Sequence, residues 1–370
     1  MGKLRVAVVG LGFGAEFVPI YQSHPEAELA GICDPRADQL DSVGERWGVP
    51  EGQRFSTFEA VLESGDVDAV HILTPPRAHA AMTLAAFDAG KHVACTVPMA
   101  VTEDECRRIT IRARETGLTY MMMETAVYTR EFLFVRDLLD RGELGRIQFL
   151  RGSHQQDMTV GWPEYWWGFP PMHYATHAVG PLFALAGSTP ESVVCFGSGR
   201  IREEYIPRYG SPFAVESALF SMRDSDIAAE ATRSLYETVR QYKESFDVYG
   251  MNGSFEWEQT IGDHPVLFTG GEDATRVEVP DFAHLLPPDI AGFTRHGALE
   301  QTEHLSVLQG SGHGGSHPHL VHEFVSAIVE GRRAAVDAPT AAAWTMAGLA
   351  AHESAMNNGA RITISDFTAI

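Results

Sequence analysis

The chain has 370 residues, of which 44% are hydrophobic, and a formal net charge of −21 at pH 7. This length is enough for two domains with a core each, and the excess of 49 Asp and Glu over 28 Lys and Arg argues against nucleic acid or an anionic membrane surface as a partner, because both attract basic surfaces. The four cysteines show no CxxC spacing, which predicts reduced thiols in a cytoplasmic protein, and no apolar run approaches the length of a membrane span.

The amino-terminal segment predicts a strand, a tight glycine turn and a helix. The apolar run LRVAVV at 4–9 is followed directly by GLGFGA at 10–15. In a dinucleotide fingerprint the first glycine permits the turn, the second lets the backbone approach the pyrophosphate, and the third position, here Ala15, allows close packing of helix and strand. Exposed amides at the helix start would hold the phosphates. The predicted contacts are Gly10, Gly12, Phe13 and Gly14.

A second apolar run, residues 27–33, ends at Asp34. This position lies about twenty residues beyond the last glycine, where a carboxylate can accept hydrogen bonds from both hydroxyls of an adenosine ribose. The carboxylate favours NAD over NADP as the cofactor. Arg36, two residues further on, is close enough to meet a 2′-phosphate, and it leaves NADP as the alternative.

Strands and helices then alternate up to about residue 123, which is typical of a doubly wound parallel sheet. We expect strands at 69–73, 92–95 and 119–123, and helices at 78–89 and 102–115. The segments that follow these strands should line the cofactor site. The candidates are Leu73, Thr74, Pro75, His79, Thr96, Val97, Pro98 and Glu124.

From residue 146 the chain changes to longer runs rich in β-branched and aromatic residues. Runs at 146–152, 192–198, 214–222, 227–233 and 244–250 predict a large, mainly antiparallel sheet with one open face, and helical patterns return at 319–330 and 340–357. We therefore expect an α/β chain with a Rossmann domain at 1–124 and an α+β substrate-binding and oligomerisation domain at 125–370. The open face predicts a homo-oligomer, a dimer or a tetramer.

The chain resembles the glucose-fructose oxidoreductase, inositol dehydrogenase and rhizopine catabolism (Gfo/Idh/MocA) family. The resemblance rests on GLGFGA at 10–15, CDP at 33–35, TPPRAH at 74–79 and GKHVACTVPMA at 90–100. In that family the last segment usually contains Glu-Lys-Pro, with the lysine near the nicotinamide and the substrate hydroxyl. Here those positions are Thr96, Val97 and Pro98. A further family pattern places Asp and His four residues apart on one helix face, where this chain has His173 and His177.

Three segments resemble the NAD-dependent glycoside hydrolases of this family, such as α-N-acetylgalactosaminidases, with sulfoquinovosidases and glycoside 3-dehydrogenases close in type. They are MMMETAVY at 121–128, GELGRIQFLRGSHQQDM at 142–158 and YATH at 174–177. The resemblance implies a glycoside substrate and hydride transfer from its C3 to NAD. On this basis Tyr174 and His177 are predicted to transfer protons, with His173 and Asp157 as orienting groups or second proton carriers.

The implied reaction follows from carbonyl chemistry. Loss of a hydride from C3 leaves a ketone, which makes the C2 proton acidic enough for a side-chain base, and the aglycone can then leave from C1. Water adds to the enone and the same hydride returns to C3, so that hydrolysis needs no net oxidation. Histidine and tyrosine can move such protons near neutral pH. The predicted function is an NAD-dependent glycosidase; the alternatives are a 3-dehydrogenase with net oxidation and a non-catalytic NAD-binding protein.

Several further residues are candidates with competing explanations. Asp157 could cap a turn instead of carrying a proton. The tryptophans in GWPEYWWGFP at 161–170 could pack in a core instead of stacking on a sugar. The histidines of GSGHGGSHPHLVH at 310–322 lack acidic and cysteine neighbours, so we predict no metal, and the glycines favour a loop near the ligand. The predicted substrate contacts are Tyr128, Gln155, Gln156, Trp166, His313 and His317.

The sequence leaves the sugar open. An anionic substituent would need arginines such as Arg200, Arg202, Arg233 or Arg240. An N-acetyl group would need amide partners such as Gln155, Gln156 and Asn252.

Overall fold

The computed structural model describes residues 2–238, 242–260, 262–270, 273–295 and 311–367, so Gly310 and Arg240 lie outside the described residues. The chain forms two compact units. Residues up to 125 belong to the first unit together with the described parts of 282–342 and Phe367, and residues 126–281 with 343–366 form the second. The chain first passes from one unit to the other after Thr125, next to the predicted boundary at 124. The segment 282–342 was expected in the second domain, but it packs on the first.

The sheet of the first unit is parallel throughout its described strands, in the order β3-β2-β1-β4-β5-β6. Val6, Ala7 and Val8 in the central strand are wholly buried, as expected for a sheet covered on both faces. The order reverses beside the first strand, which is the point where doubly wound folds bind dinucleotides. The predicted Rossmann fold is confirmed. Its strands are β1 (Leu4–Val9), β2 (Ala27–Cys33), β3 (Arg54–Phe55), β4 (Ala69–Ile72), β5 (His92–Cys95) and β6 (Tyr120–Met122).

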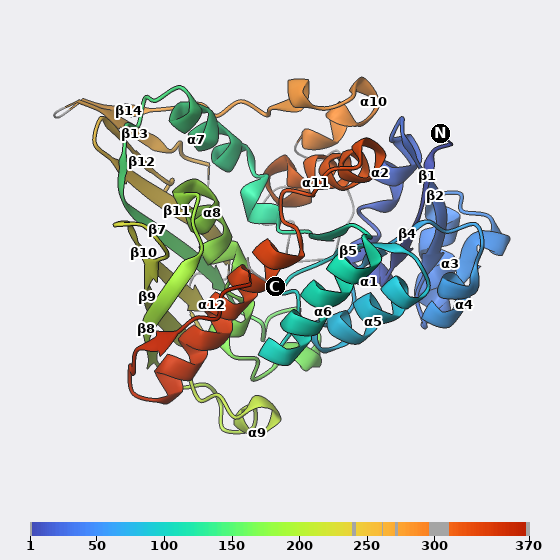
Figure 1. Ribbon diagram of the computed structural model, residues 1–370, viewed down its shortest axis with the longest axis horizontal. Helices are drawn as coiled ribbons and strands as arrows, with labels where there is room; N and C mark the ends of the chain where they lie inside the picture. The colour runs from blue at the N-terminus through green and yellow to red at the C-terminus, as the bar shows by residue number, and fades with distance from the viewer. Residues whose placement is uncertain (1, 239–241, 261, 271–272, 296–310, 368–370) are drawn as a thin grey trace. The chain divides into compact units, whose positions relative to one another are not determined.

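Helices cover both faces of this sheet. Figure 1 shows α2 and α11 on one face and α5 and α6 on the other. The longer helices have clear sequence signals: Thr102 caps α6 by accepting a hydrogen bond from the Glu105 amide, and Gly117 ends it with a φ of 66°. The helices are α1 (Leu11–Gly14), α2 (Val18–Ser23), α3 (Ala37–Arg46), α4 (Phe58–Glu63), α5 (Pro76–Asp88), α6 (Glu103–Thr116), α10 (Pro288–Ala291) and α11 (Ser311–Glu330), with 3₁₀ turns at Glu51–Gln53, Thr125–Val127, Ala283–Leu285 and Gly292–Thr294.

Helix α11 begins earlier than the sequence pattern indicates. We predicted a loop up to His319, but the described helix starts at Ser311. Within its first turn His313, Gly314 and Gly315 have φ angles of 47°, 63° and 85°. The glycines therefore serve a left-handed turn, which only glycine adopts without strain, rather than an open loop.

The second unit contains a sheet with the order β14-β13-β12-β11-β7-β10-β9-β8-β15. Neighbouring described strands are antiparallel except β7 and β10, which are parallel. This confirms the predicted large, mainly antiparallel sheet. The strands are β7 (Ile147–Gln156), β8 (Pro190–Ser198), β9 (Val215–Met222), β10 (Ala228–Ser234), β11 (Tyr242–Gly250), β12 (Gly253–Glu256), β13 (Val266–Thr269), β14 (Ala274–Arg276) and β15 (Ile362–Thr363).

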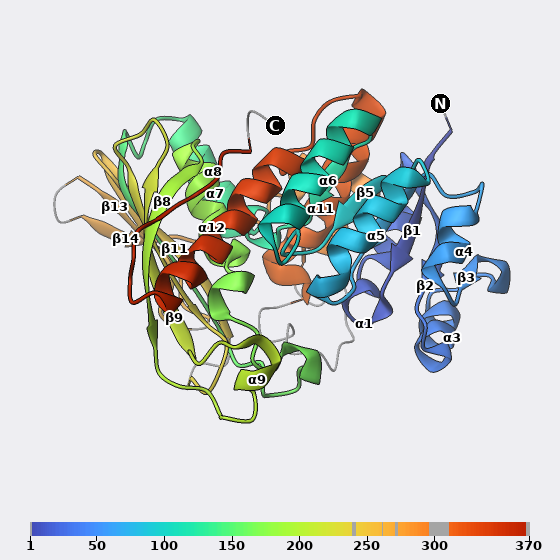
Figure 2. The same ribbon diagram turned by 60° about the horizontal axis from the view of Figure 1, so that its bottom comes forward.

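One face of this sheet is covered and the other is open. Figures 1 and 2 show α7, α8 and α12 on the covered face. Strand β7 meets α8 so closely that a Cβ on Gly152 would lie 2.2 Å from the carbonyl oxygen of Ala178. On the open face the side chains of Phe196 and Leu219 are 60% and 51% exposed. The helices are α7 (Arg130–Asp140), α8 (Thr176–Ala186), α9 (Ile206–Tyr209) and α12 (Ala338–Met356), with 3₁₀ turns at Glu164–Trp166 and Pro171–Tyr174.

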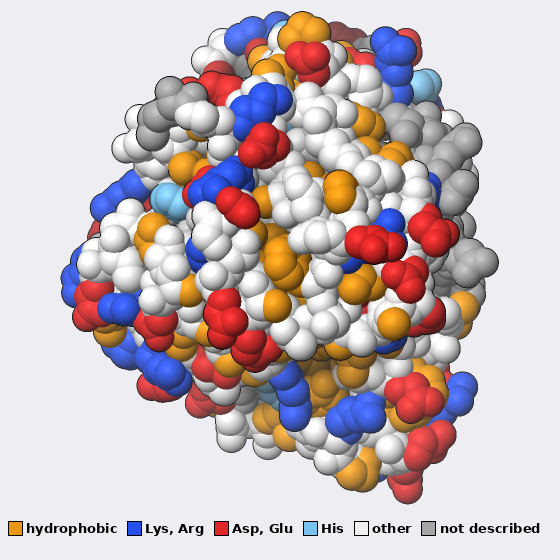
Figure 3. All heavy atoms as spheres, turned by 90° about the vertical axis from the view of Figure 1, so that its right-hand side faces the viewer, with side chains coloured by type: hydrophobic (Ala, Val, Ile, Leu, Met, Phe, Trp, Pro, Cys, Tyr) orange, Lys and Arg blue, Asp and Glu red, His pale blue; other side chains and the backbone are white. Residues whose placement is uncertain are grey.

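The surface agrees with the acidic composition. On the face shown in Figure 3, the described acidic and basic side chains are interspersed and form no continuous basic patch. Among the described helices, none combines the length and the hydrophobicity needed to cross a bilayer.

Candidate active site

The glycine turn has the geometry that a pyrophosphate requires. Gly10 has a φ of 94°, and a Cβ there would lie 2.5 Å from the carbonyl oxygen of Leu73. A Cβ on Gly14 would come within 3.1 Å of Val8 and Leu73, so α1 packs directly on the strand ends. Gly12 is exposed and has no atom within 4 Å of its Cβ position. Its backbone is therefore open to a phosphate.

Asp34 ties the end of β2 to this turn. Its Oδ2 accepts a hydrogen bond of 2.9 Å from the Leu11 amide, and its Oδ1 accepts one of 3.0 Å from the Arg36 amide. The Nε of Arg36 also lies 3.3 Å from Oδ1. Arg36 is thus engaged with the carboxylate that would bind the ribose, which favours NAD over a cofactor with a 2′-phosphate.

The other strand ends show which predicted residues support the site and which can reach a cofactor. The His79 ring is buried, with its nitrogens 2.7 Å from the carbonyl oxygens of Pro98 and Thr74, and burial lowers its pKa. It therefore braces two loops instead of contacting a cofactor as predicted. Thr74 and Pro75 are accessible, whereas Glu124 is wholly buried.

Val97 lies just after β5, at the carboxyl edge of the parallel sheet, and its side chain can neither donate nor accept a proton. Its side chain is 7% exposed, and the Val97–Pro98 peptide bond is cis. The neighbouring Thr96 donates a hydrogen bond to the carbonyl oxygen of Ile72. Leu73 is also buried. Neither Val97 nor Leu73 offers a group for proton transfer.

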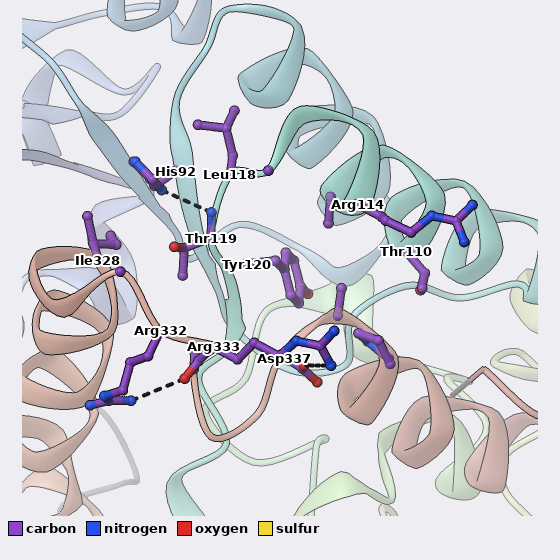
Figure 4. Close-up of a pocket in the computed structure, with 16 residues that line it drawn as sticks. His92, Thr110, Arg114, Leu118, Thr119, Tyr120, Ile328, Arg332, Arg333 and Asp337 are labelled. Atoms are coloured by element: carbon purple, nitrogen blue, oxygen red, sulfur yellow. Dashed lines mark hydrogen bonds and ion pairs between the residues drawn. The ribbon is translucent and has the colours of Figure 1, made fainter. Parts of the chain in front are cut away.

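A separate pocket of about 440 Å³ lies in the first unit (Figure 4). Its lining includes His92, the first residue of β5, and Thr119, just before β6, so it lies at the amino ends of these strands. Dinucleotides bind at the carboxyl ends. Two of its arginines are also engaged, since Arg332 binds Glu323 and Arg333 lies 3.8 Å from Asp337. This pocket is not the NAD site.

In the second unit, a phenol, an imidazole and a carboxylate lie in series. The Nε2 of His177, in the first turn of α8, is 3.3 Å from the hydroxyl of Tyr174, and its Nδ1 is 3.2 Å from Oε1 of Glu244. The side chains of His177 and Glu244 are 4% and 9% exposed, while Tyr174 is half-buried. The predicted pair Tyr174 and His177 is thus brought together, and Glu244 is added to it.

Sheet register explains why Glu244 and a further histidine, His154, belong to this cluster. The two residues face each other across β7 and β11, on the face that α8 covers. The His154 ring lies 4.9 Å from that of His177. We did not predict either residue. The only sequence signal was that side chains alternate between the two faces of a strand, which puts His154 on the same face as Gly152 and Gln156.

His154, His177 and Glu244 also form a set that could ligate a divalent metal ion. Their ligand atoms lie within 4.8 Å of one another, and imidazole with carboxylate suits several transition metals. The nitrogens of His177, however, face Tyr174 and Glu244 in the manner of a proton relay. A buried guanidinium, that of Arg233, also contributes positive charge beside Tyr174. These contacts are the ones that a proton relay requires.

Arg233 fixes the position of Tyr174 from behind. It is fully buried, and its guanidinium carbon lies 5.0 Å from the centre of the Tyr174 ring. It donates hydrogen bonds to the carbonyl oxygens of Tyr174, His154 and Ser234 and to Oε1 of Gln156. Burial lowers its pKa to about 10, so it stays charged at neutral pH.

A second carboxyl group missed by the sequence analysis is Glu131, in the first turn of α7. Burial raises its pKa to about 7, and the negative charges of Glu258 and Glu244 add to this effect. A carboxyl group that titrates near neutrality can act both as an acid and as a base. Perturbed groups of this kind are concentrated in active sites.

His173 does not share a helix face with His177. It lies in the 3₁₀ turn Pro171–Tyr174, and α8 begins only at Thr176, so the predicted spacing of four along one helix is wrong. The His173 ring instead packs 4.8 Å from that of His352, whose Nδ1 is 2.7 Å from Glu216. Burial, with His352, lowers the pKa of His173 to about 3. Its role is therefore structural.

Asp157 and Trp166 also take supporting positions. Asp157 accepts hydrogen bonds from the amide and hydroxyl of Thr159, so it caps a turn, as the alternative interpretation held. Trp166 is 5% exposed and packs 4.7 Å from the Tyr174 ring. It orders the tyrosine rather than presenting a stacking surface to a sugar.

Adjacent residues of one strand cannot both reach the site. In β7, Gln156 points to the covered face, where it binds Arg233. Gln155 points to the open face, because its strand neighbours lie on the other side. The prediction that both glutamines contact the substrate is therefore wrong for Gln155. Tyr128 is half-buried at the start of the second unit.

His313 and His317 lie in the first unit, against the glycine turn. His317 is wholly buried and stacks on Phe17 with ring centres 4.3 Å apart. His313 is 9% exposed and meets Phe13 edge-on at 5.6 Å. Direct contact of His317 with a substrate, as predicted, is incompatible with this burial.

The glycine turn and the carboxylate of Asp34 form a dinucleotide site, and the second unit brings Tyr174, His177 and Glu244 together. These features define the class of protein as an NAD-dependent enzyme. Residues 4–124 match the Gfo/Idh/MocA model, described as an oxidoreductase family with an NAD-binding Rossmann fold. The predicted resemblance to this family is confirmed for these residues, and the cofactor is NAD.

The chain is similar over its whole length to proteins named for glycoside hydrolysis. A glycosyl hydrolase family 109 protein of Saccharopolyspora erythraea is 24% identical over 99% of this chain and 83% of its own length. A second such protein, from Porphyromonas gingivalis, is 23% identical over 99% of this chain and 84% of its own length.

Solved structures agree in fold. Levoglucosan dehydrogenase in complex with NADH and L-sorbose matches with a TM-score of 0.78 at 19% identity, covering 99% of this chain and all of its own. An NAD-binding oxidoreductase from Klebsiella pneumoniae matches with a TM-score of 0.80 at 16% identity, covering 99% and 100%. At these identities the likeness concerns the fold alone.

Proposed function

We propose that this enzyme is an NAD-dependent glycoside hydrolase that oxidises its sugar transiently at C3. The observation that carries the proposal is the series of Tyr174, His177 and Glu244. The tyrosine hydroxyl is hydrogen-bonded to Nε2 of His177, and Oε1 of Glu244 lies 3.2 Å from Nδ1. Val97 stands where the family that the chain resembles usually has a lysine. The names of the full-length relatives support hydrolysis as the outcome.

The bound nicotinamide would supply the hydride acceptor, held through the glycine turn and Asp34. As the C3 hydroxyl gives its proton to the phenolic oxygen of Tyr174, the phenol passes its own proton to Nε2 of His177. Glu244 stabilises the resulting imidazolium through Nδ1. Arg233 and Trp166 hold the phenol in place.

The later steps need a group that can both take and give a proton. Once C3 is a ketone, the C2 proton must go to a base and the leaving oxygen must receive a proton. Glu131, with a pKa of about 7, suits both tasks at neutral pH. We propose it as the acid and base for elimination and for the addition of water.

The structure favours an uncharged sugar over a sulfoquinovoside. Arg233 already donates four hydrogen bonds to protein oxygens. Arg202 is paired with Glu237, and Arg200 with Glu203. Three of the four arginines considered for an anionic substituent are therefore engaged, and Arg240 lies outside the described residues. An N-acetylhexosaminide or a neutral hexoside fits better.

A 3-dehydrogenase with net oxidation is the second candidate, because a structural neighbour is a levoglucosan dehydrogenase. It would use the same relay to take the proton of the C3 hydroxyl, but the reduced cofactor would leave with the hydride from C3. We further propose a cytoplasmic homo-oligomer that assembles through the open face of the sheet.

The test is incubation with NAD and a panel of α- and β-p-nitrophenyl glycosides, with nitrophenol and NADH absorbance recorded together. Nitrophenol without matching NADH is expected, and prior dialysis against EDTA should not change the rate. Stoichiometric NADH with an intact glycoside would establish the dehydrogenase instead. Faster release from sulfoquinovoside than from neutral sugars would contradict the substrate class.

A further inference from the structure

In the glycine turn that should receive the pyrophosphate, the side chain of Leu11 is wholly buried, but the glycines beside it have no side chain to hold them. Helix α1 has four residues, its N-cap is Gly10, and no side chain caps it. Gly12 and Gly14 add no side chain of their own. Glycine-rich segments lose much conformational freedom when they become ordered. Ordering this turn on ligand binding would therefore weaken affinity unless something else holds it.

Helix α11, almost three hundred positions away in the sequence, provides that support. Phe13, the largest side chain of the turn, packs edge-on against His317 at 5.4 Å, with the ring planes 81° apart. It meets Phe17 in the same way at 5.6 Å. His317 itself stacks on Phe17 at 4.3 Å. Phe13 is thus held by two rings that are also packed against each other.

His317 lies among aromatic and imidazole rings, with one carboxyl group beside it. Its Nδ1 lies 3.2 Å from Oε2 of Glu16, the residue that follows the GLGFGA segment. The side chains are 0% and 6% exposed. Burial, with His313 and His71 nearby, holds the pKa of His317 well below its usual range. The contact is therefore one between a neutral imidazole and a carboxyl group, and the ring is held by its packing on Phe17 and Phe13.

The left-handed turn at the start of α11 explains how this helix approaches so closely. His313, Gly314 and Gly315 have positive φ angles. A Cβ on Gly315 would lie 2.8 Å from the carbonyl oxygen of Thr294. The turn is thus seated against the preceding 3₁₀ segment, and it brings the His313 ring to 5.6 Å from Phe13.

From this geometry we infer that His317 is a positioning residue for NAD: by clamping Phe13 it holds the glycine turn in the shape that binds the pyrophosphate, and so sets the affinity for the cofactor. This role replaces the predicted contact with the substrate. It depends only on NAD binding, and it holds whether the enzyme hydrolyses or oxidises glycosides.

Isothermal titration of the full chain with NAD, ADP-ribose and adenosine tests the inference. His317→Ala should raise the Kd for NAD and for ADP-ribose by a similar factor of about tenfold, because both contain the pyrophosphate. The Kd for adenosine, which reaches Asp34 without a phosphate, should change less than twofold. His317→Phe keeps a ring on Phe17, and it should restore most of the affinity.

His322→Gln is the matched control, since His322 lies on the same helix but packs on His24, away from the turn. It should leave all three Kd values unchanged. Phe13→Leu alters a half-buried position and should reproduce the loss even if His317→Ala does not fold. Unchanged NAD affinity in folded His317→Ala, or in Phe13→Leu, would overturn the inference. An equal loss for adenosine would do so as well.

Discussion

At the scale of single residues, Val97 implies that the proposed proton chemistry uses a different part of the chain. A buried valine has no group that exchanges a proton. Tyr174, His177 and Glu244 supply three such groups in series. The sequence pointed to the first two through their motif. Glu244 could not be recognised from it, because a glutamate in a strand has no local signature.

Glu244→Gln keeps the shape of this side chain and removes its charge. Because the imidazolium of His177 would lose its stabilising partner, we expect kcat for nitrophenol release to fall by about a hundredfold or more, with the Kd for NAD unchanged. Steady-state kinetics and titration calorimetry measure the two quantities. The control is Glu256→Gln, whose carboxylate accepts a hydrogen bond from Tyr249 in the same sheet. A variant with normal kcat would remove Glu244 from the relay.

At the scale of elements, strand alternation and helix boundaries decided which candidates reach the site. Gln155 and Gln156 are neighbours in sequence but point to opposite faces of β7. His173 and His177 have helical spacing, yet the helix begins between them. Both predictions used correct spacings on elements whose faces or limits were not known. Boundaries are the least reliable part of a sequence-based assignment.

The contact between β7 and α8 gives a prediction at this scale. Gly152→Ala places a Cβ 2.2 Å from the carbonyl oxygen of Ala178, so α8 must move away from the sheet. We expect a loss of about 1–3 kcal/mol in the free energy of unfolding, together with a lower kcat, because α8 carries His177. Urea denaturation measures the first quantity. Gly52→Ala, at an exposed site with open space, is the control and should have little effect. Equal stabilities would contradict the close approach.

At the scale of the whole molecule, buried histidines predict how stability depends on pH. Burial lowers the pKa of His71 to about 3 and, with further contributions from His322 and Lys3, that of His24 to about 4. The folded chain then binds fewer protons than the unfolded chain below the ordinary histidine pKa. Keeping these histidines neutral therefore costs free energy of unfolding once the pH is below about 6.5. The loss reaches about 2 kcal/mol for each histidine at pH 5.

The corresponding measurement is the free energy of unfolding between pH 7.5 and 5. This free energy should decrease steadily towards pH 5 in the natural chain. In His71→Gln it should decrease less steeply, because glutamine has no proton to gain. His264→Gln, at an exposed position, serves as the control and should follow the natural chain. A His71→Gln profile parallel to the natural one would show that this histidine is not kept neutral by folding.

The open face of the second sheet carries the prediction about assembly. Phe196 and Leu219 lie on neighbouring strands and are largely exposed. Leu219→Glu should convert a homo-oligomer to a smaller species, because a buried, unpaired carboxylate is costly in an interface. Light scattering after size-exclusion chromatography measures the mass. Val329→Glu, at an exposed apolar position in the first unit, should not change it. A natural chain that is monomeric would refute this assembly.

The sequence by itself determined the Rossmann domain, the NAD preference, the large antiparallel sheet and the pair Tyr174 and His177. These features depend on short-range patterns: an apolar strand, a glycine turn, a spaced carboxylate, and two residues three positions apart. Only the tertiary structure decided that Glu244 and His154 lie beside this pair and that His317 packs on Phe13 of the glycine turn. The physical reason is that these contacts join residues far apart along the chain. They are set by sheet register and by the packing of helix on helix, for which no local pattern exists.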